Sequence, residues 1–258
     1  MSLLTPTRRK LLTASGIMGA LSVAACDRLA ASPDVLNLLD AGEKLSINAQ
    51  RFLLSDQPLA REFADKDRSP IFKVNGSSSV RDPKYNDMAA RAFIDYRLEI
   101  GGMVNRPLSL SLAQIKTMPS RTQTTRHDCV EGWSAIGKWQ GVQLGRLLSL
   151  AGVQPGARFI LFRCADDLEP SLDGSGRYYE TIDLFDAFHA QTILAYNLND
   201  EALSIGHGAP LRLRVERQLG YKQAKFVMGI EAIDSFAKLG GGKGGYWEDR
   251  GYQWYGGI

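Results

Sequence analysis

The stretch TRHDCVEGWSAIGKW, residues 125–139, places a cysteine among charged side chains. A free cysteine in a protein core usually packs as a small hydrophobic residue with apolar neighbours. Cys129 instead follows Arg126, His127 and Asp128 directly. Cations close to a thiol lower its pKa and favour the thiolate, which is the form that binds metals and acts as a nucleophile. The setting of Cys129 therefore predicts a working thiolate.

Several segments on either side of Cys129 are predicted to be strands, and two of them, residues 96–100 and 108–112, alternate in polarity. The predicted strands are residues 96–100, 108–112, 121–129, 157–164, 192–198, 210–215 and 225–233. A short helix capped by Ser109 or Ser111 is expected to end before Pro119, and a second is expected to end at Gly152. A third helix is predicted over 183–189. The order of these elements predicts an α+β fold with mixed sheets.

The composition indicates a globular protein without affinity for nucleic acid. The chain has 258 residues, of which 44% are hydrophobic and 23% charged, so it is long enough to bury a core. It holds 31 Lys and Arg and 28 Asp and Glu, and residues 1–25 contain three of the cations and none of the acids. The remainder is balanced in charge, whereas a nucleic-acid-binding domain would show a basic stripe.

The N-terminus resembles an export signal. Arg8 and Arg9 precede the apolar run at 11–25, a pattern typical of a twin-arginine signal. Fifteen residues rise only about 22 Å as a helix, which is short of the roughly 30 Å hydrocarbon core. The run ends in VAAC, which resembles a lipoprotein box with Cys26 as the lipidated residue. Simple cleavage near Ala25 is the alternative.

Several common kinds of site find little support. No CxxC pair and no HExxH motif is present, so structural zinc and zincin chemistry are not expected. A Cys–His protease would have to use His127, two residues from Cys129, or the distant His207, and no residue that would orient either is identifiable. In an oxidising compartment Cys129 and Cys164 have the alternative of forming a disulfide.

A second concentration of charge lies at residues 206–226. It contains His207, Arg212, Arg214, Arg217, Lys222 and Lys225, set around glycines and one proline. Glycines allow the backbone to approach a ligand closely, and Arg and Lys suit phosphate recognition. A solvated basic pair of strands is the alternative.

Together these segments resemble the molybdopterin domain of the sulfite oxidase family, which includes periplasmic methionine sulfoxide reductases. CVEGWS at 129–134 is similar to the motif that carries the family's molybdenum-ligating cysteine. HGAPLR at 207–212 resembles its pterin-phosphate segment, and GYKQAK at 220–225 resembles its GxKxxK-like stretch. AYNLND at 195–200 is similar to a further family segment. The resemblance covers roughly residues 70–258.

The resemblance implies a cofactor with one pterin per molybdenum and assigns roles to individual residues. Cys129 would be the one protein ligand to the metal, and Tyr252, five residues after Trp247, would be a second catalytic residue. Arg126 and His127 would help to keep the sulfur ionised. The cofactor-binding residues would be Phe72, Asn75, Cys129, Cys164, His207, Arg212, Gln223, Ala224 and Lys225. The glycine- and aromatic-rich tail at 238–258 is predicted to be ordered and to fold back over the metal.

The implied function is two-electron, oxygen-atom-transfer-type chemistry on a small substrate by an exported enzyme in the periplasm or cell envelope. A membrane-bound or periplasmic cytochrome would exchange electrons with it, and the twin-arginine machinery would export it folded. Val74 stands where the family has an arginine. The loss of that cation disfavours sulfite as the substrate, because an oxyanion would lack a positive partner. Reduction of sulfoxides is the competing reaction within the family. A cofactor-free binding lipoprotein is the alternative of another class. The expected organisation is a signal at 1–26, a linker at 27–70 and the oxidoreductase domain at 71–258.

Overall fold

A computed structural model of the chain describes residues 32–53, 58–169 and 176–258, so the predicted signal and Cys26 lie outside the described residues. The chain divides into two compact units, Met1–Pro58 and Leu59–Ile258. The first contains helix α2 (Pro33–Leu53), a regular helix within the segment that was predicted to be a linker and lead-in. Within the described ranges, no helix has both the length and the apolar character needed to cross a bilayer.

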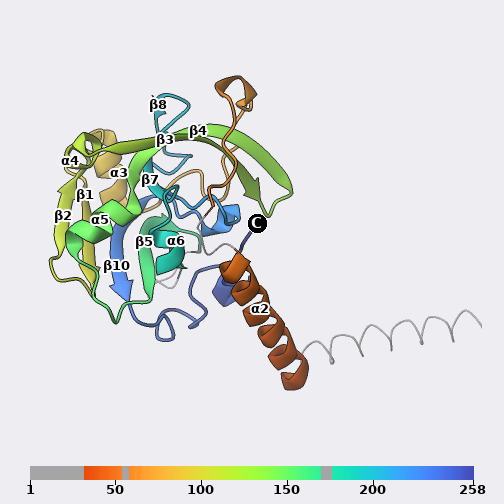
Figure 1. The fold of residues 1–258 in the computed structure, drawn as a ribbon. Helices are drawn as coiled ribbons and strands as arrows, with labels where there is room; N and C mark the ends of the chain where they lie inside the picture. Colours follow the sequence, from red (N-terminus) through yellow and green to blue (C-terminus); the bar gives the residue numbers. More distant parts are fainter. Residues whose placement is uncertain (1–31, 54–57, 170–175) are drawn as a thin grey trace, which may run out of the picture. The chain divides into compact units, whose positions relative to one another are not determined.

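The second unit is built on two sheets, which Figure 1 shows with the strands labelled. One sheet has the order β2 (Leu108–Ser111), β1 (Arg97–Gly102), β10 (Val227–Ile233), β5 (Phe159–Asp167) and β6 (Arg177–Asp183). The other has the order β3 (Ser120–Cys129), β4 (Trp133–Gln143), β7 (Ile193–Leu198) and β8 (Glu201–Ala202), with β9 (Arg212–Arg214) also paired to β7. β1 and β10 are parallel, whereas β10 and β5 are antiparallel. The prediction of an α+β fold with mixed sheets is confirmed.

Short helices lie between the strands, and α4 and α5 begin or end where the sequence predicts. They are α3 (Pro83–Ala90), α4 (Leu112–Thr117), α5 (Leu144–Ala151), α6 (Leu184–Ala187) and three single turns, η1 (Asp65–Asp67), η2 (Gly220–Lys222) and η3 (Glu248–Arg250). Ser111 caps α4, because its hydroxyl accepts a hydrogen bond from the N–H of Gln114. Gly152 ends α5 with φ +70°, in the left-handed region that glycine adopts at little cost.

The two sheets share one apolar core. Leu194 and Tyr196 of β7 pack in the same cluster as Ile100 of β1 and Phe162 of β5. The alternate β7 residues, such as Ile193, belong to a second cluster on the other face of that strand. Both faces of β7 are therefore covered, which agrees with its continuously apolar sequence.

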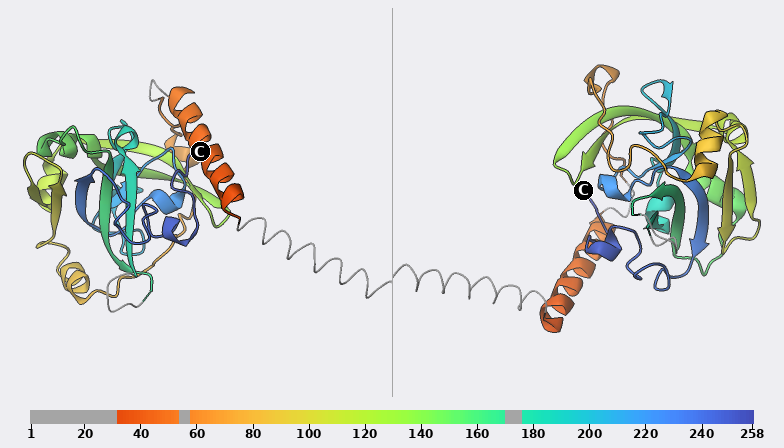
Figure 2. Two further views of the ribbon diagram at one scale, coloured as in Figure 1. Left: turned by 90° about the horizontal axis from the view of Figure 1, so that it is seen from below. Right: turned by 180° about the vertical axis from the view of Figure 1, so that it is seen from behind.

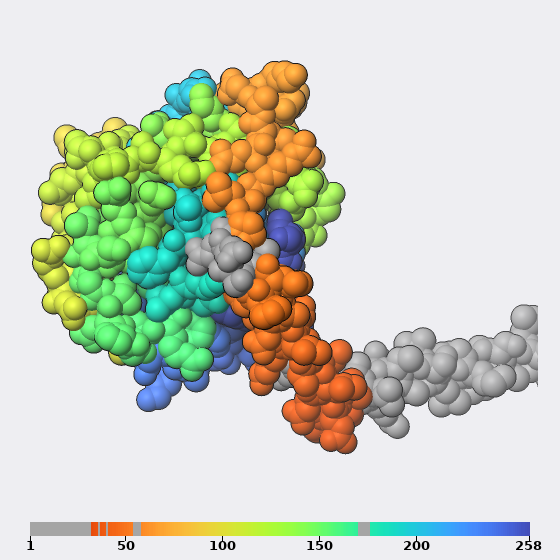
Figure 3. Space-filling view, viewed as in Figure 1, coloured from red at the N-terminus to blue at the C-terminus, as the bar shows by residue number. Residues whose placement is uncertain are grey.

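β3 and β4 form a long hairpin that curves across the unit, as Figures 1 and 2 show. Its register runs from Ser120 opposite Val142 to Cys129 opposite Trp133. Residues 59–70, drawn in light orange in Figure 3, run next to this hairpin. The N–H of Phe63 donates to the carbonyl of Thr124 in β3 at 2.8 Å, and the N–H of Ser69 donates to the carbonyl of Ile136 in β4 at 2.9 Å. Cys129 is thereby placed at the end of a strand that is held on both edges.

Candidate functional site

Cys129 is the last residue of β3 and is a partly exposed free thiol. Burial raises the pKa of this thiol above its usual value. The backbone N–H groups of Glu131 and Val130, which bond to the sulfur, and the nearby Arg212 guanidinium act in the opposite direction. The site therefore presents donors to a sulfur anion but does not by itself ionise the thiol.

The two cations next to Cys129 in the sequence do not act on its sulfur as predicted. Arg126 is exposed and pairs with Asp128, with 2.9 Å between Nε and Oδ2. Alternate residues of a strand point to opposite faces, so Arg126 is turned away from Cys129. His127 is on the inner face, but its burial lowers the pKa of the imidazole well below its usual value and keeps the ring neutral. The prediction that both hold the sulfur ionised is wrong.

Two cations in this region are buried without an anionic partner. Arg212 is fully buried, and burial followed by repulsion from Arg214 lowers its pKa to about 9. Lys225 is nearly buried, and burial followed by repulsion from Arg212 lowers its pKa to about 7. Among the described residues neither side chain forms an ion pair with a carboxylate, and the Arg212 Nε has no partner. The three hydrogens of the Lys225 ammonium go to the carbonyl oxygens of Asn75, Ser77 and Gly206, so its donors are satisfied while its charge is not neutralised by a carboxylate. Buried positive charge of this kind favours an anion close by.

The loop before α3 supplies polar atoms that hold the same cations. The Asn75 side-chain oxygen accepts a hydrogen bond from Arg212 at 2.9 Å, and the Asn75 carbonyl accepts one from Lys225 Nζ at 2.7 Å. The carbonyl of Phe72 lies 3.0 Å from His207 Nε2, while His207 Nδ1 lies 2.8 Å from the Ser204 hydroxyl. The structure thus brings together predicted site residues that are more than 130 positions apart in the chain.

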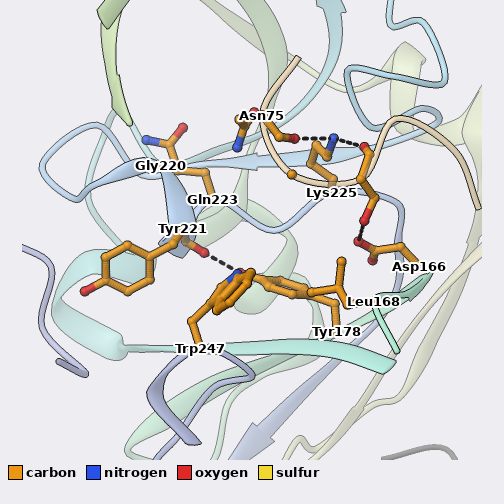
Figure 4. A pocket seen from close by; sticks show the side chains of 11 residues that line it. Asn75, Asp166, Leu168, Tyr178, Gly220, Tyr221, Gln223, Lys225 and Trp247 are labelled. Carbon is orange, nitrogen blue, oxygen red and sulfur yellow. Dashed lines mark hydrogen bonds between the residues drawn. The ribbon is translucent and has the colours of Figure 1, made fainter. Parts of the chain in front are cut away.

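A pocket opens beside these groups and is drawn in Figure 4. Its cavity volume is about 50 Å³, measured as the space open to the centre of a water-sized sphere, and one side of it is open to solvent. Its lining comprises Asn75, Gly76, Ser77, Asp166, Leu168, Tyr178, Gly220, Tyr221, Gln223, Lys225 and Trp247. In Figure 4 the polar residues Asn75, Gln223 and Lys225 lie on one side and the rings of Tyr178 and Trp247 on the other. A flat heterocycle with polar edges would suit such a pocket.

The glycine-rich tail is ordered and folds back as predicted. Its Trp247 lines the pocket, and Tyr252 stacks on Trp247 with 5.4 Å between ring centroids. Tyr252 also meets the ring of Tyr221 edge-on at 5.2 Å and keeps 40% of its surface exposed. The tail therefore delivers both aromatic residues to the rim of the pocket.

A buried ion triad fastens this tail to the pocket. Lys222 is fully buried and donates to Glu180 of β6 and, at 2.6 Å, to Glu248 of η3. Burial and the neighbouring Glu248 raise the pKa of Glu180 well above its usual value. Lys222 therefore has a structural role between two neighbours of the pocket, Tyr221 and Gln223.

Two predicted cofactor-binding residues lie behind the pocket wall. Ala224 is buried in the main apolar cluster. Cys164 is a buried free thiol that lines a neighbouring cavity, which shares Tyr178 with the pocket. Because Cys129 and Cys164 are both free, the structure contains no disulfide between them.

The residues present fit a molybdopterin. Its phosphate would meet the anion requirement of Arg212 and Lys225, and the unpaired Nε of Arg212 is a donor still available to it. Its dithiolene-bound metal would find a protein sulfur at Cys129, and thiolates are the soft ligands that such redox metals accept.

The sequence profile of the oxidoreductase molybdopterin-binding domain family matches residues 86–238. The chain belongs to this family. It is therefore an oxidoreductase of the molybdenum-cofactor-dependent class, as the motifs predict.

Two curated relatives of this molybdopterin-binding oxidoreductase are named for one activity. A protein of Azospira oryzae named as a protein-methionine-sulfoxide reductase subunit, YedZ1, is 33% identical over 98% of this chain and 88% of its own length. The protein-methionine-sulfoxide reductase catalytic subunit MsrP of Campylobacter jejuni is 29% identical over 72% of this chain and 65% of its own length. The solved sulfane dehydrogenase SoxCD of Paracoccus pantotrophus is 26% identical, with a TM-score of 0.49 over 55% of this chain and 39% of that chain.

Some residues of the oxidoreductase site were not singled out from the sequence. Trp139 is fully buried and packs under both Arg212 and Arg214, with 5.2 and 4.4 Å between guanidinium carbon and ring centroid. Gly220 lies against His127, where any Cβ at position 220 would be 2.5 Å from the ring. Gly220 is part of the GYKQAK motif, but only the fold shows that the absence of a side chain at this position leaves room for the His127 ring.

Proposed function

We propose that this chain is an exported molybdenum enzyme that reduces a sulfoxide group on a small substrate or an exposed side chain. One observation carries the proposal: Arg212 and Lys225 are buried near the strand end that bears Cys129, and neither pairs with a carboxylate of the part of the chain that the structure describes. A phosphate-bearing cofactor with a metal at the cysteine accounts for all three residues. The names of the two curated relatives support the sulfoxide as the substrate.

The residues divide into a metal side and a cofactor side. Cys129 ligates the molybdenum, and the bound cofactor supplies two-electron oxygen-atom transfer. His207, Arg212 and Lys225 hold the phosphate end, while Asn75 orients the two cations through its amide and carbonyl oxygens. The predicted cofactor-binding set is completed by Phe72, Cys164, Gln223 and Ala224. Of these, Cys164 and Ala224 would support the pocket wall from the side that faces away from the cofactor. In the net reaction the sulfoxide takes up two electrons and two protons and yields a sulfide and water.

The rim of the pocket supports a neutral substrate rather than sulfite. Val74 is 39% exposed, and the loop that holds His207 packs against it through Gly206. No charge stands at this position, so a doubly charged oxyanion would lack one charge-assisted hydrogen bond, worth about 1.5–3 kcal/mol. Tyr252 is partly exposed beside the pocket-lining Trp247 and Tyr221, and its hydroxyl is proposed to donate to the sulfoxide oxygen.

The reaction needs electrons from outside the chain. Both curated relatives are named as subunits, which supports a second protein that delivers them. We propose a membrane-bound or periplasmic cytochrome for that role and the twin-arginine route for export of the folded oxidoreductase domain, residues 71–258. Cys26 would be the lipid attachment site, or the signal would be cleaved near Ala25.

The proposal is tested on full-length protein purified after native export. We expect about one molybdenum and one pterin per chain, turnover of a small sulfoxide with a reduced dye, and weak or absent sulfite oxidation. Cys129→Ser should abolish turnover, and Tyr252→Phe should lower it without changing the metal content. Lys84→Met, at an exposed lysine away from the pocket, is the matched control for Lys225→Met, which should lose pterin. Efficient sulfite oxidation, or full activity in Cys129→Ser, would refute the assignment.

A further inference from the structure

Asp166 is the one carboxylate among the described residues that line the pocket. It lies near the end of β5 and is 4% exposed. Its Oδ2 accepts a hydrogen bond from the Ser77 hydroxyl at 3.0 Å, whereas Oδ1 is buried and has no partner within the described part of the chain. In Figure 4 the Asp166 carboxyl group points toward the interior of the pocket. A buried polar atom without a partner costs about 1–3 kcal/mol, and a ligand in the pocket would supply the missing partner.

Ser77 connects Asp166 to the pocket-lining cation Lys225. The Ser77 carbonyl accepts a hydrogen bond from Lys225 Nζ, while the Ser77 hydroxyl donates to Asp166. The two charged side chains thus contact the same residue without forming an ion pair with each other. An anion that binds beside Lys225 therefore comes close to the Asp166 carboxyl group. An ionised Asp166 would repel this anion, whereas a protonated one could donate a hydrogen bond to it.

The surroundings of Asp166 disfavour its ionised form. Burial raises the pKa of its carboxyl group to about 6, although the hydrogen bond from Ser77 and the charge of Lys225 act in the opposite direction. The other titratable groups that face it are Asp167 and Cys164 of β5, Tyr85 of α3 and Tyr178 of β6. Asp167 raises the pKa of Asp166 further, and the thiol and the two phenols are neutral because burial raises the pKa of each. A bound anion would add another negative charge and favour the protonated carboxyl group still more.

We propose that Asp166 is a cofactor-binding residue whose carboxyl group takes up a proton from solvent when the cofactor binds and donates a hydrogen bond from Oδ1 to the cofactor phosphate. The proposal rests on the proposed function for the identity of the ligand. Lys225 then balances the charge of the phosphate instead of the charge of Asp166, and the Ser77 hydroxyl continues to hold Oδ2. Binding of the cofactor is therefore coupled to the uptake of one proton by the protein.

Three substitutions in the full chain separate the hydrogen bond from the charge. Asp166→Asn keeps a donor beside the phosphate but does not titrate, whereas Asp166→Ala has no donor. Asp87→Asn, at an exposed position of α3, is the control that changes the net charge by the same amount. Each protein is purified with its cofactor, and the rate of pterin release is followed between pH 5 and 9 by the fluorescence of the oxidised pterin.

We expect wild type to release pterin faster at pH 9 than at pH 5, by at least about two- to twelvefold more than Asp166→Asn does, which corresponds to the loss of one hydrogen bond of about 0.5–1.5 kcal/mol. Asp87→Asn should follow wild type. Asp166→Ala should release pterin roughly two- to twelvefold faster than Asp166→Asn at every pH, because it lacks the donor.

Two results would overturn the inference alone. One is the wild-type pH dependence in Asp166→Asn. The other is faster release from Asp166→Asn than from wild type at both ends of the pH range, which would show that the carboxylate accepts a hydrogen bond from an N–H of the cofactor instead. A wild-type protein that releases pterin with the expected pH dependence but reduces no sulfoxide would overturn the proposed function alone.

Discussion

Replacing Gly220 by alanine should insert a methyl group into a space that has no room for it. The new Cβ would lie 2.5 Å from Cε1 and 2.6 Å from Nε2 of His127, and 3.3 Å from the Asp128 carbonyl. The ring cannot give way, because Arg214 and Phe72 hold it. Overpacking of this kind costs about 1–3 kcal/mol, and the lower entropy of the unfolded alanine chain returns about 0.4–1 kcal/mol.

The net expectation for Gly220→Ala is a loss of about 1–2 kcal/mol in the free energy of unfolding, measured by urea denaturation of the cofactor-free full chain. Gly101→Ala is the matched control, because a Cβ at position 101 would meet nothing within 4 Å and its backbone is outside the left-handed region. That variant should be unchanged or slightly more stable. In a His127→Ala background the cost of Gly220→Ala should fall below about 0.5 kcal/mol. An unaltered cost there, or none in the wild-type background, would refute the assigned clash.

Three further predictions concern the charges and thiols of the site. Lys222→Met should lower the free energy of unfolding by about 3–5 kcal/mol at pH 8, because it leaves two carboxylates buried without their cation. The loss should be smaller at pH 5, because Glu180 has a raised pKa and becomes protonated as the pH falls. Equal losses at both pH values in urea titrations would contradict this. Burial raises the pKa of Asp166 to about 6, so its ionisation costs stability as the pH rises from about 4 through 6. Asp166→Asn should therefore be about 1–3 kcal/mol more stable than cofactor-free wild type at pH 8 and no more stable at pH 4. If the free energies of unfolding of the two proteins differed by the same amount at every pH, this prediction would be wrong. In cofactor-free protein carrying Cys26→Ala, iodoacetamide should label the partly exposed Cys129 but leave the buried Cys164 unmodified until denaturant is added. Mass spectrometry of the labelled protein measures this. Equal labelling of the two thiols would contradict the difference in their burial.

Local pattern predicted much of the fold and the family to which the chain belongs. The alternation of residues 96–100 and 108–112 predicted β1 and β2, and the serine before α4 and the glycine after α5 marked ends that the structure confirms. The Cys129 and His207 motifs indicated the family because each is a short, contiguous segment whose chemistry is legible without the fold.

What the sequence did not predict depends on contacts between distant segments. Lys222 was one member of a basic run, yet its partners Glu180 and Glu248 lie 42 and 26 positions away. Arg126 is only three residues before Cys129 in the sequence, but its side chain lies on the opposite face of the strand from the Cys129 thiol. Helix α2 was read as a linker, although its Ser-Pro-Asp start is a typical helix beginning.

Three of the four tryptophans of the chain surround the site. Trp139 lies under Arg212, Trp133 packs on the His127 ring, and Trp247 lines the pocket. The fourth, Trp254, lies 5.3 Å from the buried Lys222 ammonium that fastens the tail. Indole emission depends strongly on nearby charge and on adjacent chromophores that absorb in the near ultraviolet. Much of the native fluorescence of the protein therefore comes from the surroundings of the pocket, and a titration of the unlabelled chain with cofactor should change it.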